Sequence, residues 1–525
     1  MKNSNKLVGS TILIIIFSLI GKILGFLRES FIAAKFGANM QVDAFLLSQS
    51  AIALIASIIT AAIATTFIPV LQKVERDLGE EKKQDFTNNM IAISIVASVI
   101  FMVISVVFSR QVAFLFTFDY NYEGFDLITK LIKISVPTIL FSVMLGIFTG
   151  YLQYGGKFGI VGAIAIPLNL VNIIYLILFS KSLGIVGLTV ASMLGVLAQL
   201  LFLLPSSFKL GYRPKLVFDI KDKYVIEALI LSLPVFVSSS VDNVNSIVNR
   251  AIALRMGNGA VTILSFANKL NIMFIGIVIT AITAVIFPVM SRSFGNDDIT
   301  RGKKVMNASI KIVLYLTIPA AVGMFILARP IIEITFLHGK FTMDNAIATT
   351  ATLRCYTLSL ISLSMISVLN RVYYALSDTK TPFVIGILNV IMNISMNIFV
   401  AYRFGTKGLA ASVSISTTIT AILLFILLRK KLGNLGTKTY VKALIKSIMA
   451  ATVMAMSCLI YYEVEKYVFS VDAMSKIAKV IVLFMVIGIS ALIYVGILYL
   501  LGVREIKDVF RLIKNKLNKR KLRAA

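Results

Sequence analysis

The feature that most constrains this chain is a series of apolar runs, each long enough to cross a bilayer, that recurs from end to end. A transmembrane helix needs about 20 mainly apolar residues. Hydrophobic residues make up 58% of the 525 positions and charged residues only 14%, too few to cover a soluble protein of this length. We therefore expect an all-α polytopic membrane protein. About fourteen spans are expected, centred near residues 20, 58, 98, 140, 170, 194, 240, 276, 315, 360, 391, 418, 450 and 488.

Positive charge gathers in the short segments between these runs. The chain has 52 Lys and Arg against 24 Asp and Glu, a net charge of +28. Such a charge can indicate nucleic-acid binding, but basic residues in short loops are how a membrane protein fixes its orientation, so nucleic acid is not an expected partner. The bias predicts that both termini are cytoplasmic. The loops then inside are KVERDLGEEKK, FKLGYRPKLVFDIKDK, SRSFGNDDITRGKK and RKKLGNLGTK, with the C-terminal tail.

The chain also repeats itself weakly at an offset of about 220 residues. YLQYGGKFGIVG (151–162) parallels YALSDTKTPFVIG (374–386), and SLGIVGL (182–188) parallels RFGTKGL (403–409). Six spans are followed by six more in the same order, and an even number preserves topology, so the repeats are parallel. The expected parts are a six-helix N-terminal lobe (1–215), a six-helix C-terminal lobe (216–432), two further helices (433–503) and a basic amphipathic cytoplasmic tail (504–525).

Motifs for catalysis are absent from the sequence. GYLQYGGKF comes nearest to a phosphate-binding loop, but Phe158 stands where Ser or Thr should coordinate magnesium. His338, Cys355 and Cys458 cannot build a thiolate–imidazole site for a transition metal. We therefore expect a secondary transporter and not an enzyme, with no cofactor and with Na⁺ or H⁺ as the kind of ion that would couple transport.

The stretch GKILGFLRES places charged side chains inside the first apolar run. At about 100° per residue, Gly21, Lys22, Gly25, Arg28 and Glu29 fall within an arc of about 120° on a helix. Ionisable groups at membrane depth are costly and tend to face a partner or a wet cavity, and glycines allow close helix approach. The simpler alternative is that Lys22 and Glu29 neutralise one another.

Three later spans carry further polar groups at depth. Asn268 and Lys269 lie on the eighth, where a lysine snorkelling to the interface is the alternative. Asp242, on the seventh, suits a cation, a proton or a partner lysine. Asn393 and Asn397 lie one turn apart on the eleventh, and interhelical hydrogen bonding alone would also explain them. A cleft with basic residues from both lobes suits an anionic substrate, because Arg and Lys match phosphate oxygens.

Over nearly its whole length the chain resembles the MurJ (MviN) lipid II flippases of the MOP superfamily. The matching stretches are GKILGFLRESFIAAKFGANMQVDAF, SFANKLNIMFIGIVITAITAVIFPVMSRSF, TFLHGKFT and NRVYYALSDTKTPFVIG. The resemblance implies fourteen helices in two lobes, with the last two extending a groove for a lipid tail. It implies export of the undecaprenyl-diphosphate-linked precursor lipid II across the bacterial cytoplasmic membrane by alternating access. Membrane lipids and the cell-wall synthesis machinery are the other partners it implies.

The resemblance also implies roles for particular residues. Lys22, Arg28 and Lys269 match cationic positions and would bind the diphosphate, and Asp43 matches the acid of the family's DAF motif. The family's second-helix arginine has no counterpart, since IALIASIITAAIATTF is neutral. Some members bind sodium between the seventh, eleventh and twelfth helices, and Asp242 resembles part of that site. The cavity and its gating would be supported by Gly21, Gly25, Glu29, Asp43 and Asn268, and the candidate cation site would comprise Asp242, Asn393 and Asn397.

Three alternative functions remain open on the sequence. A flippase for another polyprenyl-diphosphate oligosaccharide would meet the same diphosphate and differ only in its sugar contacts. A MATE-like drug/cation antiporter of the same superfamily should have an acidic cleft, and the expected cleft here is basic. A membrane scaffold would not need charged groups at depth in both lobes.

Overall fold

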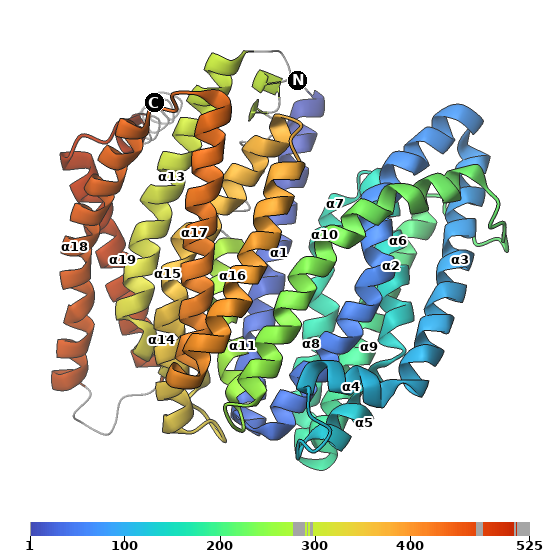
Figure 1. Cartoon of the computed structure of the whole chain (residues 1–525), viewed down its shortest axis with the longest axis horizontal. Coiled ribbons are helices and arrows are strands. Elements are labelled where there is room, and N and C mark those ends of the chain that lie inside the picture. The colour runs from blue at the N-terminus through green and yellow to red at the C-terminus, as the bar shows by residue number, and fades with distance from the viewer. Residues whose placement is uncertain are drawn as a thin grey trace, which may run out of the picture. The chain divides into compact units, whose positions relative to one another are not determined.

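The computed structural model describes residues 2–276, 289–290, 292–294, 298–468, 476–508 and 511, and these residues form helices and no strands (Figure 1). The all-α class predicted from the apolar runs is confirmed. The helices are α1 (Lys2–Phe36), α2 (Met40–Leu78), α3 (Glu80–Val107), α4 (Ser109–Thr117), α5 (Phe125–Ser135), α6 (Thr138–Tyr154), α7 (Phe158–Gly162), α8 (Ala165–Leu178), α9 (Ser180–Lys209), α10 (Lys223–Leu254), α11 (Ala260–Phe274), α13 (Ile299–Ile326), α14 (Ala328–Phe336), α15 (Met343–Ala375), α16 (Lys380–Phe404), α17 (Thr406–Leu432), α18 (Thr437–Val468) and α19 (Lys476–Leu500).

The described residues contain 10 helices that are long and apolar enough to cross a membrane, or 11 if the bent pair α5 and α6 forms one span. The chain is therefore a multi-pass membrane protein, as predicted. Every expected span centre except the one near residue 276 lies inside one of these α-helices, and residue 276 lies in a π-helical turn directly after α11. The expected total of fourteen membrane crossings stays a prediction, as does the amphipathic tail, most of which lies outside the described residues.

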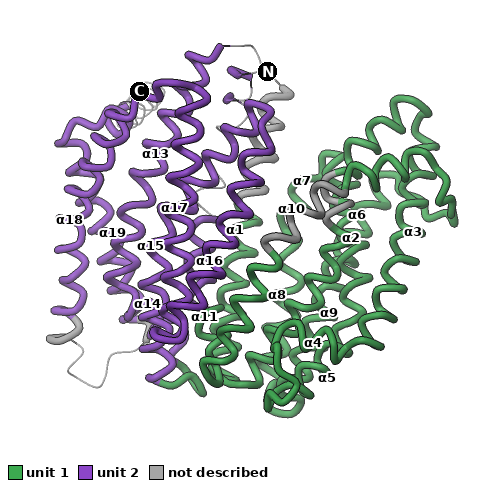
Figure 2. The backbone as a smooth tube through the Cα atoms, viewed as in Figure 1, with its two compact units in different colours: residues 1–265, 338–342 green, residues 266–337, 343–525 purple. Residues whose placement is uncertain are grey.

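By their internal contacts the helices form two compact units (Figure 2). Unit 1 comprises residues 1–265 with 338–342, and unit 2 comprises residues 266–337 with 343–525. Buried side chains of α2, α3, α6 and α9 build one apolar core in unit 1, and side chains of α13, α15, α17, α18 and α19 build another in unit 2. These units group helices by contact and do not test the lobes expected from the sequence repeat, whose boundaries at 215 and 432 stay a prediction.

The expected repeat is visible in the local backbone of both units. Gly156 follows α6 at φ 72° and Ser377 follows α15 at φ 59°, 221 residues later. Each amide donates to the carbonyl three residues back, and the next amide donates to the carbonyl five residues back, which is a Schellman helix end. Gly184 and Gly405, also 221 residues apart, have nearly the same angles, φ 56° and ψ −148° against φ 61° and ψ −144°.

Helix α10 belongs to unit 1 because it packs antiparallel along α2. Three polar pairs join the two helices, and in each pair the residue numbers add to 300, so one register holds along the whole contact. We call this contact the α2–α10 seam. Its pairs are Lys73 with Glu227 (Nζ to Oε1 2.8 Å), Ser57 with Asn243 (Oγ to Nδ2 3.3 Å) and Ser50 with Arg250.

Candidate functional site

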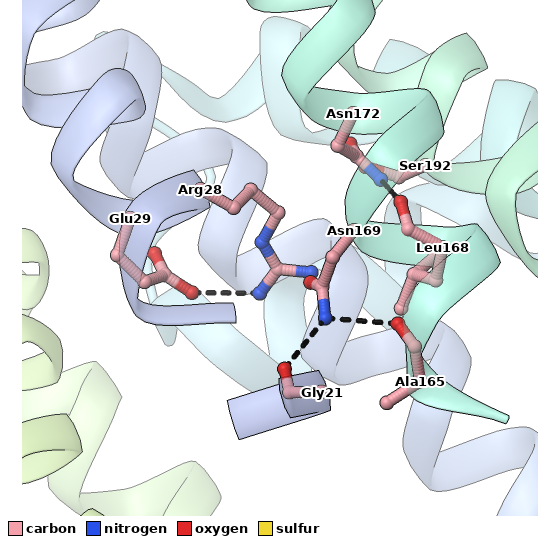
Figure 3. Close-up of polar contacts among 8 residues, drawn as sticks. All are labelled: Gly21, Arg28, Glu29, Ala165, Leu168, Asn169, Asn172 and Ser192. Carbon is pink, nitrogen blue, oxygen red and sulfur yellow. Dashed lines mark hydrogen bonds and ion pairs between the residues drawn. The ribbon is translucent and has the colours of Figure 1, made fainter. Parts of the chain in front are cut away.

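The two glycines of α1 face α8, and Figure 3 shows Gly21 beside Ala165 and Asn169 of that helix. A Cβ added at Gly21 would stand 2.9 Å from the Cβ of Ala165, and one added at Gly25 would stand 3.6 Å from Nδ2 of Asn169. The Asn169 amide donates to the carbonyl oxygens of Gly21 (3.1 Å) and Ala165 (2.9 Å). The sequence predicted the close approach, and the structure identifies the partner helix as α8.

The charges that follow the glycines also turn toward the protein. Nη2 of Arg28 forms an ion pair with Oε1 of Glu29 at 2.7 Å, and the two side chains are only 19% and 6% exposed. Nε of Arg28 is buried and has no hydrogen-bond partner among the described residues. Lys22, which lies less than two turns before Arg28 on the same helix, is half-buried. The apolar residues Ile23 and Leu27 are exposed. The first helix therefore has the polar and apolar faces that its sequence predicted.

The buried Nε leaves Arg28 with a donor that has no acceptor among the described residues. A buried donor without an acceptor costs about 1–3 kcal/mol, and Glu29 engages only one edge of the guanidinium fork. A phosphate oxygen is an acceptor that suits the remaining donors, because the fork of arginine binds such groups in two-point fashion.

Asp43, in the first turn of α2, is fully buried and caps the start of α11. One carboxylate oxygen accepts from the Gly259 amide at 2.7 Å. The other accepts from the Thr262 amide at 2.8 Å and from the Thr262 hydroxyl at 2.6 Å. A carboxylate at a helix N-terminus satisfies amides that have no partner within the helix. Asp43 therefore joins the starts of two helices that are far apart in the sequence.

Two further loops pack beside this cap. Gly259 has φ +87°, and a Cβ there would stand 2.5 Å from the Ala38 carbonyl oxygen. A Cβ at Gly339 would stand 2.1 Å from the carbonyl oxygen of Ala34, and the Lys340 amide donates to that same oxygen at 2.9 Å. The GANMQVDAF and HGKFT stretches, separated by about 290 residues, therefore belong to one packed cluster in unit 1.

The eighth-span residues lie on α11, within unit 2. Asn268 is half-buried and Lys269 is exposed. Asn271, one turn beyond, is buried; its Nδ2 donates to Oγ of Ser359 at 3.0 Å, and its Oδ1 is buried without a hydrogen-bond partner. Because Lys22 and Arg28 belong to unit 1, the expected diphosphate site draws on both units, and it stays a prediction.

The two amides of α16 are hydrogen-bonded to one another. Nδ2 of Asn397 donates to Oδ1 of Asn393 at 3.3 Å, and both side chains are buried. Nδ2 of Asn393 is buried without a hydrogen-bond partner among the described atoms. The side chain of Asp242 lies outside the described residues, so the candidate cation site also stays a prediction.

Three polar residues at membrane depth were not predicted as site residues. Asn169 joins α8 to α1, Asn271 joins α11 to α15, and Arg250 of α10 donates to the carbonyl oxygen of Leu46 on α2 at 3.0 Å. The available signal was a polar side chain inside an apolar run, the same signal that singled out Arg28. This signal did not show which of the many polar side chains in apolar runs reach a neighbouring helix.

Comparison with solved structures shows which fold the chain has. An inward-facing MATE-family multidrug resistance transporter of the MOP superfamily matches with a TM-score of 0.66 at 15% identity, over 79% of this chain and 96% of that one. A lipid II flippase MurJ in an inward closed conformation matches with a TM-score of 0.75 at 22% identity, over 93% of this chain and all of that one. The fold is that of a MOP superfamily transporter.

The family follows from the sequence comparisons. The family model described as lipid II flippase MurJ matches residues 32–479. The probable lipid II flippase MurJ of Vibrio cholerae is 28% identical, covering 96% of this chain and 98% of the relative. That of Buchnera aphidicola from Schizaphis graminum is 27% identical, covering 95% and 98%. The chain belongs to the lipid II flippase MurJ family.

Proposed function

We propose that this protein is a flippase that moves lipid II, an undecaprenyl-diphosphate-linked peptidoglycan precursor, from the inner to the outer leaflet by alternating access. Membership of the MurJ family supports the substrate. The single observation that carries the proposal is Arg28, a guanidinium at membrane depth whose buried Nε has no acceptor. A diphosphate oxygen would supply that acceptor.

Lys22, Arg28 and Lys269 are the proposed diphosphate ligands. With Glu29 these residues carry two net positive charges, and a diphosphate diester carries about two negative charges. Gly21 and Gly25 would set the distance of α1 from α8, and Glu29 would hold one edge of Arg28. Asp43 and Asn268 complete the proposed support of the cavity and its gating.

The proposed setting is the bacterial cytoplasmic membrane, with both termini in the cytoplasm. The excess of Lys and Arg in the loops on one side supports this orientation. Na⁺ or H⁺ is the proposed coupling ion, and Asp242, Asn393 and Asn397 are its proposed site. The cell-wall synthesis machinery is the proposed user of the exported precursor.

Complementation of a strain depleted of its lipid II flippase tests the substrate and the three ligands together. Lys22→Ala, Arg28→Ala and Lys269→Ala should each abolish growth, because each removes one of the positive charges that would bind the diphosphate. Lys22→Arg should support growth, because it preserves the charge. Arg28→Lys should be impaired, because lysine cannot copy the fork.

Lys181→Ala is the matched control, since Lys181 is an exposed lysine at the start of α9 and should be dispensable. Immunoblots must show equal protein in every strain. Growth of all three alanine variants at normal protein levels would remove the physical basis of the proposal. Failure of the wild-type chain to complement, with export of another polyprenyl-diphosphate glycolipid, would instead favour the alternative substrate class. The MATE-like alternative is secondary, since those structures show a shared fold at 15% identity.

A further inference from the structure

The connection between α9 and α10 exposes a ridge of large apolar side chains. Residues 213–219 are neither helical nor stranded, and we call residues 213–220 the connector. Leu216, Phe218 and Ile220 are 96%, 52% and 60% exposed. They occupy alternate positions, and alternate side chains of an extended chain lie on one face. A ridge of this size facing water would be costly, which indicates that something apolar covers it.

The connector is held in this arrangement by two buried asparagines of α3. Nδ2 of Asn88 donates to the Arg213 carbonyl oxygen at 3.0 Å, and Oδ1 of Asn88 accepts from the Tyr212 hydroxyl at 2.9 Å. Asn89 both donates to the carbonyl oxygen of Asp219 and accepts from the Asp219 amide, each at 2.8 Å. The backbone is therefore fixed near both ends of the connector, and the three side chains of the ridge stay exposed.

The two asparagines also determine at which level along α3 the connector is attached. The helix begins with a charged stretch, residues 80–85, and continues as an apolar run from Met90 to Val107. Residues 88 and 89 stand at the change from one to the other, where a spanning helix passes from headgroups to hydrocarbon. Farther along, α3 presents exposed apolar side chains to its surroundings: Ile95, Val96, Val99, Ile100 and Val103. The helix that holds the connector thus presents a surface suited to lipid beyond the two asparagines.

Basic residues flank the ridge. The stretch from 209 to 223 contains five Lys or Arg and two Asp, a net charge of +3. Positive residues beside an apolar ridge complement a leaflet with anionic headgroups. Lys215 also reaches Oδ1 of Asp85 at 3.0 Å, so one of these cations is positioned by the charged end of α3.

We propose that the connector is an interfacial membrane anchor. Leu216, Phe218 and Ile220 insert at the boundary between headgroups and acyl chains, and the flanking Lys and Arg contact anionic headgroups. Under the proposed topology this is the cytoplasmic leaflet. The expected boundary between the two sequence repeats, at residues 215 and 216, falls inside the connector, so the anchor would tether the chain where one repeat passes into the next. The anchor does not depend on which lipid is transported.

Tryptophan fluorescence tests this directly, because the chain contains no tryptophan. Leu216→Trp and Phe218→Trp are made singly in the full-length protein and reconstituted into vesicles containing phosphatidylglycerol. Both positions are exposed, so the substitutions should leave folding unchanged, and size-exclusion profiles check this. We expect blue-shifted emission, strong quenching by lipids brominated high on their acyl chains, and little quenching by aqueous acrylamide.

The matched control is Leu78→Trp. Leu78 is 49% exposed and directly precedes the turn into α3. The first residue of α3 lies about 13 Å along the helix from Asn89, on the side of the charged stretch, so we expect Leu78 to lie in water. This tryptophan should respond to acrylamide and not to bromine. The anionic contribution is tested in vesicles of phosphatidylcholine alone, where bromine quenching at residues 216 and 218 should weaken.

Two results would overturn the anchor. Acrylamide quenching at residues 216 and 218 as strong as at 78, with no response to bromine, would place the ridge in water. Protection from acrylamide in native membranes but not in vesicles of the purified protein would show that another protein covers the ridge. Bromine quenching that is equal with and without anionic lipid would remove the role of the basic flanks.

Discussion

Asp43, in the first turn of α2, accepts three hydrogen bonds at the start of α11: one from Gly259, just before the helix, and two from Thr262 in its first turn. Both oxygens are used as acceptors, and each of the three partner atoms is a donor. The residue is fully buried, so water cannot replace any of the three bonds. An isosteric amide cannot serve here, since one of its two ends is a donor.

We therefore predict that Asp43→Asn lowers the free energy of unfolding by about 1–3 kcal/mol, because a donor would face a donor in a buried site. Thermal unfolding of purified protein in detergent measures the change. Thr262→Val should have a smaller effect, because it removes only the hydroxyl bond, and Thr262→Ser, which keeps the hydroxyl, is the control. An unfolding temperature unchanged by Asp43→Asn would show that the cap contributes nothing to stability.

At this scale the sequence predicted which residues carry charge at depth and not what they contact. Arg28 and Glu29 were expected on one face, and they lie there. The sequence left open which of the two positive residues Glu29 would neutralise. Adjacent residues on a helix diverge by about 100°, and only long side chains bring Arg28 and Glu29 together. Asn169 lies more than 130 residues from Arg28, and a single sequence does not show that α8 packs against α1.

Among the connecting elements, the turn between α15 and α16 is held by hydrogen bonds that its own sequence supplies. Ser377 takes the left-handed conformation that ends α15. Asp378 then accepts from the amide of Thr381 at 3.0 Å and from its hydroxyl at 2.9 Å, which caps the first turn of α16. Nζ of Lys431, in the last turn of α17, bonds the same carboxylate at 2.7 Å. The SDTKTP sequence thus fastens three helix ends.

The stability of this turn should depend on pH. Burial of the carboxyl acts to raise the pKa of Asp378, but the bonds from Lys431 and Thr381 outweigh it and lower the pKa from 3.8 to about 2. The folded state therefore favours the ionised form. The resulting stabilisation is present in full above about pH 4 and is lost as the pH falls toward 2.

Asp378→Asn keeps a capping oxygen and removes the charge. We predict that the variant unfolds at a lower temperature than the wild type at pH 7, and that the difference shrinks between pH 4 and pH 2. Unfolding temperatures in detergent across this range provide the measurement. A difference that stays constant down to pH 2 would mean that the charge of Asp378 plays no part. Asp378→Ala, which also removes the cap, should cost about 1 kcal/mol more at every pH.

The sequence predicted the helices well and their partners poorly. The apolar runs located the spans, and the two stretches that contain Gly156 and Ser377 were paired from their letters alone. The turn that both stretches form was seen only in the structure. That α10 would pack along α2 was not predicted, since the polar pairs of the α2–α10 seam are single residues scattered through apolar runs. Pairing between distant helices depends on side-chain packing that no local pattern encodes.

At the scale of the whole molecule, we propose that transport draws on a gradient of Na⁺ or H⁺. An acid at membrane depth is the expected sensor, because moving one charge through 100 mV is worth about 2.3 kcal/mol. Asp242 is the proposed acid, with Asn393 and Asn397 as its proposed neighbours.

We predict that purified protein in vesicles flips lipid II without nucleotide, that an imposed Na⁺, H⁺ or electrical gradient changes the rate, and that Asp242→Asn removes this response without unfolding the protein. Accessibility of the lipid II headgroup to a membrane-impermeant reagent measures flipping. Asp119→Asn, a neutralised acid in an exposed loop, is the control. Normal responses of the Asp242 variant to every gradient would exclude it as the ion site.

The constant register of the α2–α10 seam has a mechanical consequence. Its outermost pairs, Ser50 with Arg250 and Lys73 with Glu227, are about 35 Å apart along the helix, a distance that crosses the hydrocarbon layer. Sliding one helix past the other by a single turn would move the partners in every pair about 5.4 Å apart. Because one register holds for all three pairs, no such shift would preserve one pair while breaking the others. The two helices therefore resist sliding along one another as a unit, since all three pairs are either formed or broken together.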